Sequence, residues 1–123
     1  MGYGQRVWVF TDAERPPEGN NIIRGHESVI ILNSGQTEAN VKITFFFEDK
    51  EPIILPNVIV GACRVRCLRT GDENGFGRYT VDEGVQYAIT LESDVPVVAQ
   101  YGRAEPREVS FYTTLGYFCS TET

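Results

Sequence analysis

Apolar and polar residues alternate with a period of two along several short segments of the chain. The clearest alternation runs through residues 41–47, VKITFFF, and residues 85–91, VQYAITL. Such alternation predicts β-strands that bury one face and expose the other. In the first segment Lys42 and Thr44 fall on the exposed face. The side chains expected to point inward are Val41, Ile43, Phe45, Phe47, Val85, Tyr87, Ile89 and Leu91.

Shorter apolar runs bounded by turn residues predict further strands. They lie at residues 7–10, 27–33, 53–60, 62–69, 96–103 and 111–118. The turn between 85–91 and 96–103 is assigned to SDVP, and Pro56 inside 53–60 predicts an edge strand or a bent one. No segment has a convincing helical period. This spacing of strands and turns predicts one domain over residues 1–123, a β-sandwich or barrel of seven to nine strands.

The charge balance narrows the classes of partner. The formal net charge is −6, which disfavours non-specific nucleic-acid binding because that draws on a basic surface. The basic residues are almost all arginine, with only Lys42 and Lys50 as lysines, so local patches suited to interfaces are expected. No signal peptide and no membrane-spanning apolar run is visible, and the three cysteines are an odd number. We therefore expect a cytoplasmic location and no insertion into a membrane.

The cysteines do not predict a metal or redox site. Cys63 and Cys67 are four residues apart on a predicted strand, roughly 13 Å at the rise of a strand. That separation prevents both a mutual disulfide and shared ligation of one zinc ion. We expect both to pack in the core, and we expect no metal and no cofactor.

Two arginines alternate with these cysteines. Arg64 and Arg66 are expected on the strand face opposite to the cysteines, and an unpaired arginine pair cannot enter a dry core. One interpretation is a solvated outer face that pairs with carboxylates. The other is a docking surface for an anionic partner or another subunit.

The only histidine adjoins a glutamate at a strand entry. A pair such as His26 and Glu27 is able to perform acid–base chemistry, but no nucleophile accompanies it. The sequence also lacks nucleophile-elbow, zinc-protease, phosphate-loop and paired-carboxylate motifs. We therefore expect no catalytic residues and no enzymatic activity.

The stretch VPVVAQYGR, residues 95–103, places polar residues in an apolar strand. Gln100 and Arg103 are an odd number of residues apart, so they face opposite ways. Arg103 shares its face with Ala99 and Tyr101. Either this strand has one face in the core and the other in a polar network or interface, or it holds an edge glutamine and an arginine near a loop.

Four segments in order resemble the sensory rhodopsin transducer family. They are HESVIILNSG (26–35), VKITFFFEDKEP (41–52), VIVGACRVRCLR (58–69) and SDVPVVAQYGR (93–103). The most specific pieces are the His-Glu pair leading into a strand that ends L-N-x-G, the D-K-E-P turn and V-P-V-V-x-Q-x-x-R. The resemblance runs from about Trp8 to Tyr117. Two loops, TDAERPPEGNNIIRG and TGDENGFGRYTVDEG, depart from the family pattern, as do the two cysteines.

The resemblance implies an antiparallel, jelly-roll-like β-sandwich that forms a homotetramer. It further implies a cytoplasmic adaptor that docks on a seven-helix receptor, a sensory rhodopsin. A likeness to carbohydrate-binding sandwiches and a role in gene regulation also attach to the family. The positions that match its motifs are His26, Glu27, Asn33, Asp49, Arg64, Gln100 and Arg103, and Arg66 joins them from the strand pattern as a partner- or ligand-binding residue.

The sequence thus predicts a soluble, oligomeric signalling adaptor that acts by protein–protein binding. The alternative is a sandwich module that binds a carbohydrate or another small ligand. In that case Trp8, Tyr87 or Tyr101 would supply an aromatic platform beside Gln100 or Arg103. An aromatic exposed in a concave groove favours the ligand module, whereas aromatics buried between the sheets favour the adaptor.

Overall fold

The fold is all-β and antiparallel in the computed structural model, which describes residues 2–19, 24–69, 81–105, 110–114 and 117–119. No helix occurs within these ranges, and every ladder between their strands is antiparallel. The predicted class is therefore confirmed. The strands are β1 Gln5–Glu14, β2 His26–Asn33, β3 Ala39–Phe46, β4 Ile53–Val60, β5 Arg64–Arg69, β6 Gln86–Glu105, β7 Ser110–Thr114 and β8 Tyr117–Cys119.

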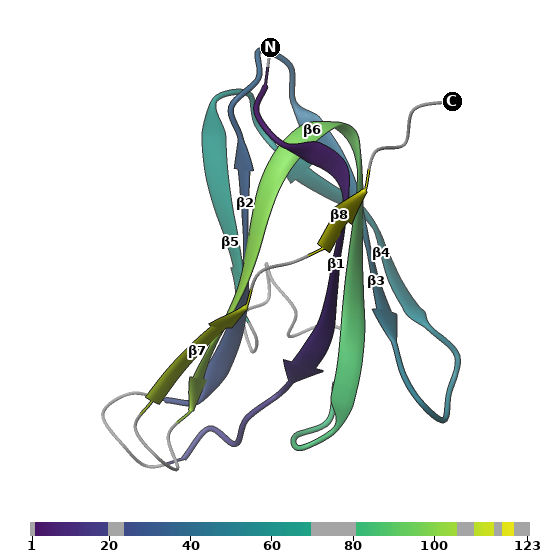
Figure 1. Cartoon of the computed structure of the whole chain (residues 1–123), viewed down its shortest axis with the longest axis vertical. Coiled ribbons are helices and arrows are strands. Elements are labelled where there is room, and N and C mark those ends of the chain that lie inside the picture. Colours follow the sequence, from purple (N-terminus) through teal and green to yellow (C-terminus); the bar gives the residue numbers. More distant parts are fainter. Residues whose placement is uncertain (1, 20–23, 70–80, 106–109, 115–116, 120–123) are drawn as a thin grey trace.

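A single long strand, β6, joins the two halves of the sheet. Its first part pairs with β1 and β3, and its second part pairs with β2 and β7. Figure 1 shows β6 rising along one half, bending over the top and descending in the other half. One half of the sheet has the order β4-β3-β6-β1-β8, and in the other half β5 pairs with β2, β2 with β6, and β6 with β7. The result is one sheet curled into a half-barrel, and the finer jelly-roll description stays a prediction.

The turn predicted at SDVP is wrong. Residues 93–96 continue β6, so the two predicted strands at 85–91 and 96–103 are one strand. The ladder with β3 ends at Ser93, and the ladder with β2 begins at Val98. Between them the Val95 amide donates to Ser93 Oγ at 3.3 Å. The strand therefore bends at the point where its neighbours change.

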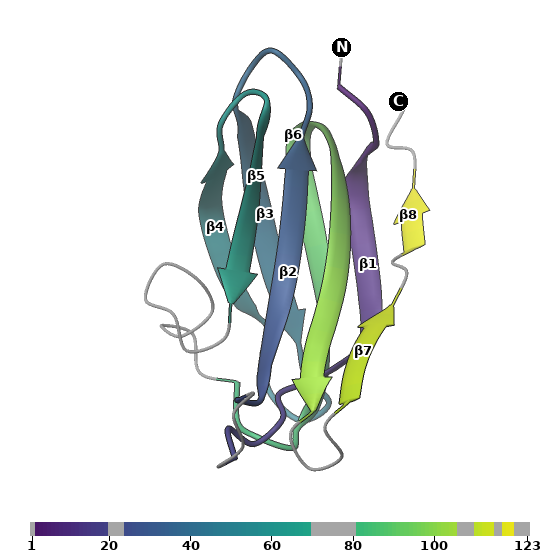
Figure 2. The same ribbon diagram turned by 90° about the vertical axis from the view of Figure 1, so that its left-hand side faces the viewer.

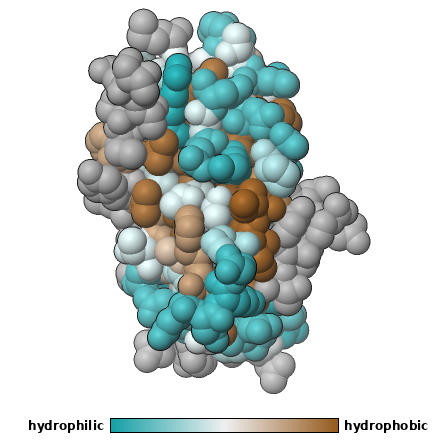
Figure 3. Space-filling view, turned by 90° about the vertical axis from the view of Figure 1, so that its right-hand side faces the viewer, coloured by the Kyte–Doolittle hydropathy of each residue, from teal (hydrophilic) through white to brown (hydrophobic). Residues whose placement is uncertain are grey.

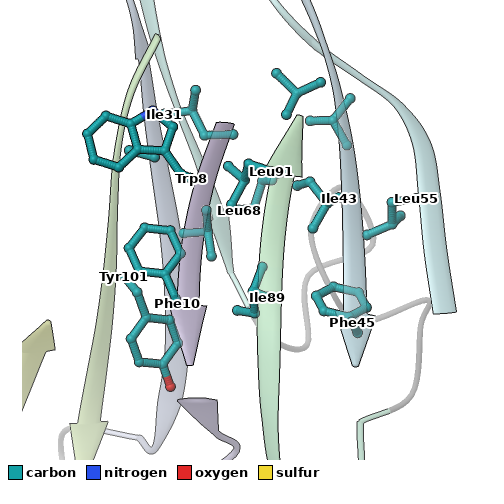
Figure 4. Packing of buried hydrophobic residues seen from close by; sticks show 14 of the residues in the cluster. Trp8, Phe10, Ile31, Ile43, Phe45, Leu55, Leu68, Ile89, Leu91 and Tyr101 are labelled. Atoms are coloured by element: carbon teal, nitrogen blue, oxygen red, sulfur yellow. The ribbon is translucent and has the colours of Figure 1, made fainter. Parts of the chain in front are cut away.

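The hydrophobic core lies between the two halves of the curled sheet (Figure 4). On β3 the expected alternation is confirmed at Val41, Ile43 and Phe45, which are buried, and at Lys42, which is exposed. Thr44 lies on the face of Lys42 but is only 6% exposed, so its predicted exposure is wrong. The inward positions of β6 are confirmed at 87, 89 and 91, whereas Val85 precedes the strand and is exposed. The strand predicted over 111–118 corresponds to β7 and β8, and residues 115–116 lie outside the described residues.

Strand β4 is an edge strand and is bent, as Pro56 predicts. Among the described residues it forms a ladder with β3 alone. The register shifts between Val41 and Ile43, opposite the stretch of β4 that contains Pro56. Figure 2 shows β4 and β5 along the same side of the molecule, one from each half.

The bend in β6 decides where its two ends lie. Both ends reach the lower end of the molecule in Figure 1, where β1 ends and β2 begins. Polar side chains from β2 and from both ends of β6 are therefore brought together at this end, under the hydrophobic core.

Candidate functional site

A buried carboxylate occupies the lower end of the core. Glu27 is on the inward face of β2, in phase with Val29, Ile31 and Asn33, and only 1% of its surface is exposed. Carboxylates are almost never fully buried without partners, because the desolvation of a charge is costly. The buried carboxylate of Glu27 therefore requires hydrogen-bond donors or positive charges from within the protein.

Two tyrosines from opposite ends of β6 supply those partners. The Tyr87 hydroxyl donates to Glu27 Oε2 at 2.6 Å, and the Tyr101 hydroxyl donates to the same oxygen at 2.7 Å. Hydrogen bonds to an ionised acceptor are short and roughly twice as strong as neutral ones. Figure 4 shows the Tyr101 hydroxyl pointing away from the apolar core, with its ring near that of Phe10.

Two arginines add positive charge around this cluster. Arg103 lies directly opposite Glu27 in the ladder between β2 and β6, and its guanidinium is 3.5 Å from the carbonyl oxygen of Glu14. Arg15 follows β1 and donates to the carbonyl of Val81 at 2.9 Å. We call Glu27, Tyr87, Tyr101, Arg15 and Arg103 the polar cluster.

The environment keeps both hydroxyls of the polar cluster protonated. Burial raises the pKa of Tyr87 and of Tyr101 above the ordinary value, and the charge of Glu27 and the hydrogen bonds to it raise them further. Arg15 opposes the rise in the pKa of Tyr87, and Arg103 opposes that of Tyr101. The tyrosines are therefore fixed donors, and the cluster tethers both ends of β6 to the start of β2.

A pH dependence of stability follows from these two tyrosines. A pKa that is raised in the folded state gives stability that is complete below the unfolded-state pKa, 10.0 for tyrosine, and that is lost as the pH rises further. We expect the free energy of unfolding to fall above about pH 10, by up to about 1.4 kcal/mol per pH unit for each tyrosine. Urea denaturation between pH 8 and 11 measures this. The Tyr87→Phe/Tyr101→Phe variant should show a flatter decline, and an equal decline in both proteins would contradict the assignment.

The structure separates His26 from Glu27. As neighbours on a strand they face opposite ways, and His26 lies on the outer side. Its Nδ1 is 2.8 Å from the carbonyl oxygen of Arg24 and 3.1 Å from the guanidinium of Arg69. The two residues therefore do not form an acid–base pair.

Asn33 ties two turns together. Its side-chain amide donates to the carbonyls of Thr37, Val60 and Gly61 at 2.9, 3.1 and 3.2 Å, and its Oδ1 accepts from the Gly35 amide at 3.0 Å. Asn33 is fully buried, so these contacts satisfy both ends of its amide group. The L-N-x-G motif thus has a structural function, which is to fix the β2–β3 turn against the end of β4.

The orientation predicted for residues 63–67 is wrong. Both Cys63 and Cys67 are exposed, and Cys63 lies in the turn before β5 with φ of 53°. Arg64 and Arg66 are instead in phase with the buried Leu68. Arg66 is half-buried and donates to the carbonyl of Ile59 on β4 at 2.9 Å, so it bridges the two halves. Long arginine stems make this inward placement possible.

The remaining predicted site residues lie apart from the polar cluster. Gln100 is exposed on the outer face of β6, opposite to the face of Tyr101, as the odd spacing from Arg103 requires. Asp49 is exposed in the turn between β3 and β4, beside Lys50, whose ammonium lies 4.3 Å from the centre of the Phe47 ring. Of the predicted set, the polar cluster therefore contains Glu27 and Arg103, while Asn33 and Arg64 are ladder partners at the other end of β2.

The aromatic residues proposed as a sugar platform are buried. Trp8, Tyr87 and Tyr101 all belong to the core between the two halves. The indole N–H of Trp8 donates to the carbonyl of Val97 at 2.9 Å. None of the three offers an open ring face to a ligand. Aromatics buried between the sheets are what the sequence analysis expected of the adaptor and not of the ligand module.

An apolar patch lies on the outer face of the half that contains β3. Phe46 is 42% exposed and Ile54 is 49% exposed. Ladder partners place Ile54 beside Thr44, Thr44 beside Thr90, and Phe46 beside Ala88. Figure 3 shows hydrophobic residues in the middle of this face with hydrophilic ones above and below. We call Thr44, Phe46, Ile54, Ala88 and Thr90 the outer patch.

Two kinds of feature are absent from the described part of the chain. No helix there is long and apolar enough to cross a membrane. No group of three or more histidine, cysteine, aspartate or glutamate residues there is placed to hold a metal ion.

The sequence contains signals for the polar cluster that the predictions above did not use. The period-two pattern places Glu27 inward with Val29 and Ile31, and it places Tyr87 and Tyr101 inward on β6. A buried tyrosine hydroxyl needs a hydrogen-bond partner, and so does a buried carboxylate. For the outer patch the pattern of a single strand shows only Phe46, an apolar residue on the face of Lys42, because Ile54 comes from another strand.

The chain is an antiparallel all-β protein built on a curled sheet, with a polar cluster buried at one end of its core. Residues 3–118 match the model of the family described as Anabaena sensory rhodopsin transducer. The chain belongs to this family, which confirms the resemblance of its motifs and makes it a protein of the transducer type. No curated protein matches the chain.

Two solved structures support the assignment. The crystal structure of Thermotoga maritima 1070 is 31% identical, with a TM-score of 0.82 over 95% of this chain and 97% of that chain. The Anabaena sensory rhodopsin transducer is also 31% identical, with a TM-score of 0.68 over 82% of this chain and 96% of that chain. The match therefore extends over nearly the full length of both relatives.

Proposed function

We propose that the chain is a cytoplasmic signalling adaptor that works as a homo-oligomer through protein–protein binding and has no enzymatic activity. Membership of a family named for a sensory rhodopsin transducer supports this function. By the same analogy the oligomer is a tetramer, the receptor is a sensory rhodopsin, and residues 1–123 form one jelly-roll-like sandwich domain.

The outer patch is the observation that carries the proposal. Its two large apolar side chains, Phe46 and Ile54, are close to half exposed and lie on the neighbouring strands β3 and β4, where Thr44 pairs with Ile54 on one side and with Thr90 on the other. Large apolar side chains grouped on one exposed face mark an interaction surface. A symmetric assembly that covers this face also protects the edge strand β4.

Some of the predicted contact residues lie at the surface, and others are buried. His26, Asp49, Arg64 and Gln100 reach the surface, and we assign them to contacts with a partner. Glu27 and Asn33 are buried and serve the fold instead, since their polar atoms are occupied by hydrogen bonds within the chain. Burial of the three candidate platform aromatics supports the adaptor over a carbohydrate module.

Self-association is tested by charging the outer patch. The wild-type chain should have a mass of about 55 kDa by light scattering, which is four times 13.8 kDa. Phe46→Glu/Ile54→Glu should reduce this to the mass of one chain, because four or more buried charges of one sign would face each other. Glu48→Gln/Asp94→Asn, at two exposed polar positions, is the control and should leave the mass unchanged. A wild-type monomer would contradict the proposal.

Receptor binding is the second arm of this experiment. The wild-type oligomer is titrated against a detergent-solubilised sensory rhodopsin, and saturable binding is expected at physiological salt. A glycan array is screened with the same preparation. Sugar binding that free sugar competes away, without any binding to the rhodopsin, would replace the adaptor by the ligand module.

A further inference from the structure

Within the part of the chain that the structure describes, strand β5 lies at an edge of the sheet. Among the described residues it forms a ladder with β2 alone, and the register runs without a shift from Arg64–Asn33 to Arg69–Ser28. Strand β4, on the same side of the molecule, carries a proline and a register shift, which are protective features of edge strands. Strand β5 has neither of these two features and is protected by its arginines alone, so its outer edge is a regular template for a strand that complements those charges.

The charge of β5 is opposite to that of the protein as a whole. Three of its six residues, Arg64, Arg66 and Arg69, are arginine and none is acidic, whereas the chain has a formal net charge of −6. The guanidinium of Arg66 bridges to the carbonyl of Ile59, and Arg64 and Arg69 are exposed. This edge therefore attracts a negatively charged segment.

An apolar row begins at β5 and crosses the outer face of its half. Val65 is 63% exposed, and its ladder partner Leu32 on β2 is 39% exposed. Leu32 in turn pairs with the half-buried Val98 on β6. A strand added beside β5 would extend this row with its own apolar side chain next to Val65.

We propose that the outer edge of β5 binds an extended segment of a partner protein with alternating acidic and apolar residues, by β-strand addition. Main-chain hydrogen bonds to the edge supply affinity, and the arginines and Val65 select the side chains. This inference rests on the proposed function and specifies the chemistry of the adaptor's partner.

A second copy of β5 fits this edge poorly in the register that pairs all six of its residues. In the antiparallel register that pairs all six residues of two copies, Arg64 lies opposite Arg69 twice. Like charges directly opposite each other destabilise a strand pair. A segment whose acidic residues lie on the face of Arg64 and Arg66, with its apolar residues beside Val65, pairs attractively instead, so charge complementarity favours it over this self-pairing.

A peptide titration tests the proposal on the full chain. The probe is a fluorescent eight-residue peptide of alternating glutamate and valine, and its matched control has lysine in place of glutamate. We expect the acidic peptide to bind at least about tenfold more tightly by anisotropy. Arg64→Glu/Arg69→Glu should weaken binding by about tenfold or more, whereas Arg6→Glu/Lys50→Glu, with the same net charge, should not.

Amide hydrogen exchange distinguishes strand addition from simple charge attraction. Alternate amides of residues 64–69 should exchange at least about tenfold more slowly in the complex. Equal affinity for the two peptides, or binding without slower exchange in β5, would overturn the proposal. Oligomer mass and rhodopsin binding are measured independently of the peptide. A failure here with those results intact therefore rejects strand addition and leaves the adaptor function standing.

Discussion

Replacement of Glu27 by alanine is expected to lower the free energy of unfolding by about 4 kcal/mol. The change leaves the hydroxyls of Tyr87 and Tyr101 buried without their acceptor, and each such orphaned group costs roughly 1–3 kcal/mol. It also removes the carboxylate that lies opposite Arg103 in the ladder. Guanidinium denaturation at a fixed protein concentration measures the loss.

Replacing Glu27, Tyr87 and Tyr101 together should lower the free energy of unfolding less than replacing Glu27 alone by alanine. In Glu27→Leu/Tyr87→Phe/Tyr101→Phe the acceptor and both donors disappear together, so no hydroxyl is left unpaired. We expect this triple variant to recover at least about half of the loss caused by Glu27→Ala. Glu48→Ala, an exposed glutamate, is the control and should change stability by no more than about 0.5 kcal/mol. A triple variant less stable than Glu27→Ala would show that the hydrogen bonds do not govern the effect.

Replacement of Asn33 by leucine is expected to lower the free energy of unfolding by about 3 kcal/mol. Leucine has nearly the same size but cannot donate to the carbonyls of Val60 and Gly61 or accept from the Gly35 amide. Because the site is buried, water cannot fully replace these partners, and orphaned groups cost roughly 1–3 kcal/mol each. Thermal and guanidinium denaturation both report the change.

The matched control for Asn33 is another asparagine. Asn57 accepts a single hydrogen bond from the Asn40 side chain at 3.3 Å in an exposed position. Asn57→Leu should therefore shift stability by about 0.5 kcal/mol or less. If both leucine variants lost the same stability, the strand ending in L-N-x-G would not depend on its asparagine.

The sequence predicted strands well where one face meets the core and the other meets water. Residues 41–47 and 87–91 are of this kind, and their inward side chains were identified by period alone. SDVP failed because its proline and aspartate are typical of turns. In the folded chain the same residues bend a strand as its neighbours change from β3 to β2. That exchange depends on distant strands, so no local pattern signals it.

Prediction of side-chain direction failed where both phases of a strand contain apolar residues. On β5, Val65 and Leu68 belong to opposite faces, so period two did not decide whether the cysteines or the arginines point inward. The polar cluster was only half predictable. Inward phase identifies Glu27, Tyr87 and Tyr101 singly, but their meeting requires the bend in β6 that brings its two ends together.

The shared strand β6 also governs the order in which the protein is able to form on the ribosome. The partners of Trp8 and Val29 in β6 are Leu91 and Tyr101, so the central ladders of both halves wait until most of the chain has been synthesised. Contacts this distant in sequence close slowly, since the entropy of a long loop must be lost first. Of the ladders between the described strands, those of β3 with β4 and of β2 with β5 are the ones able to form before β6 emerges. The early strands of the nascent chain are then exposed to chaperones.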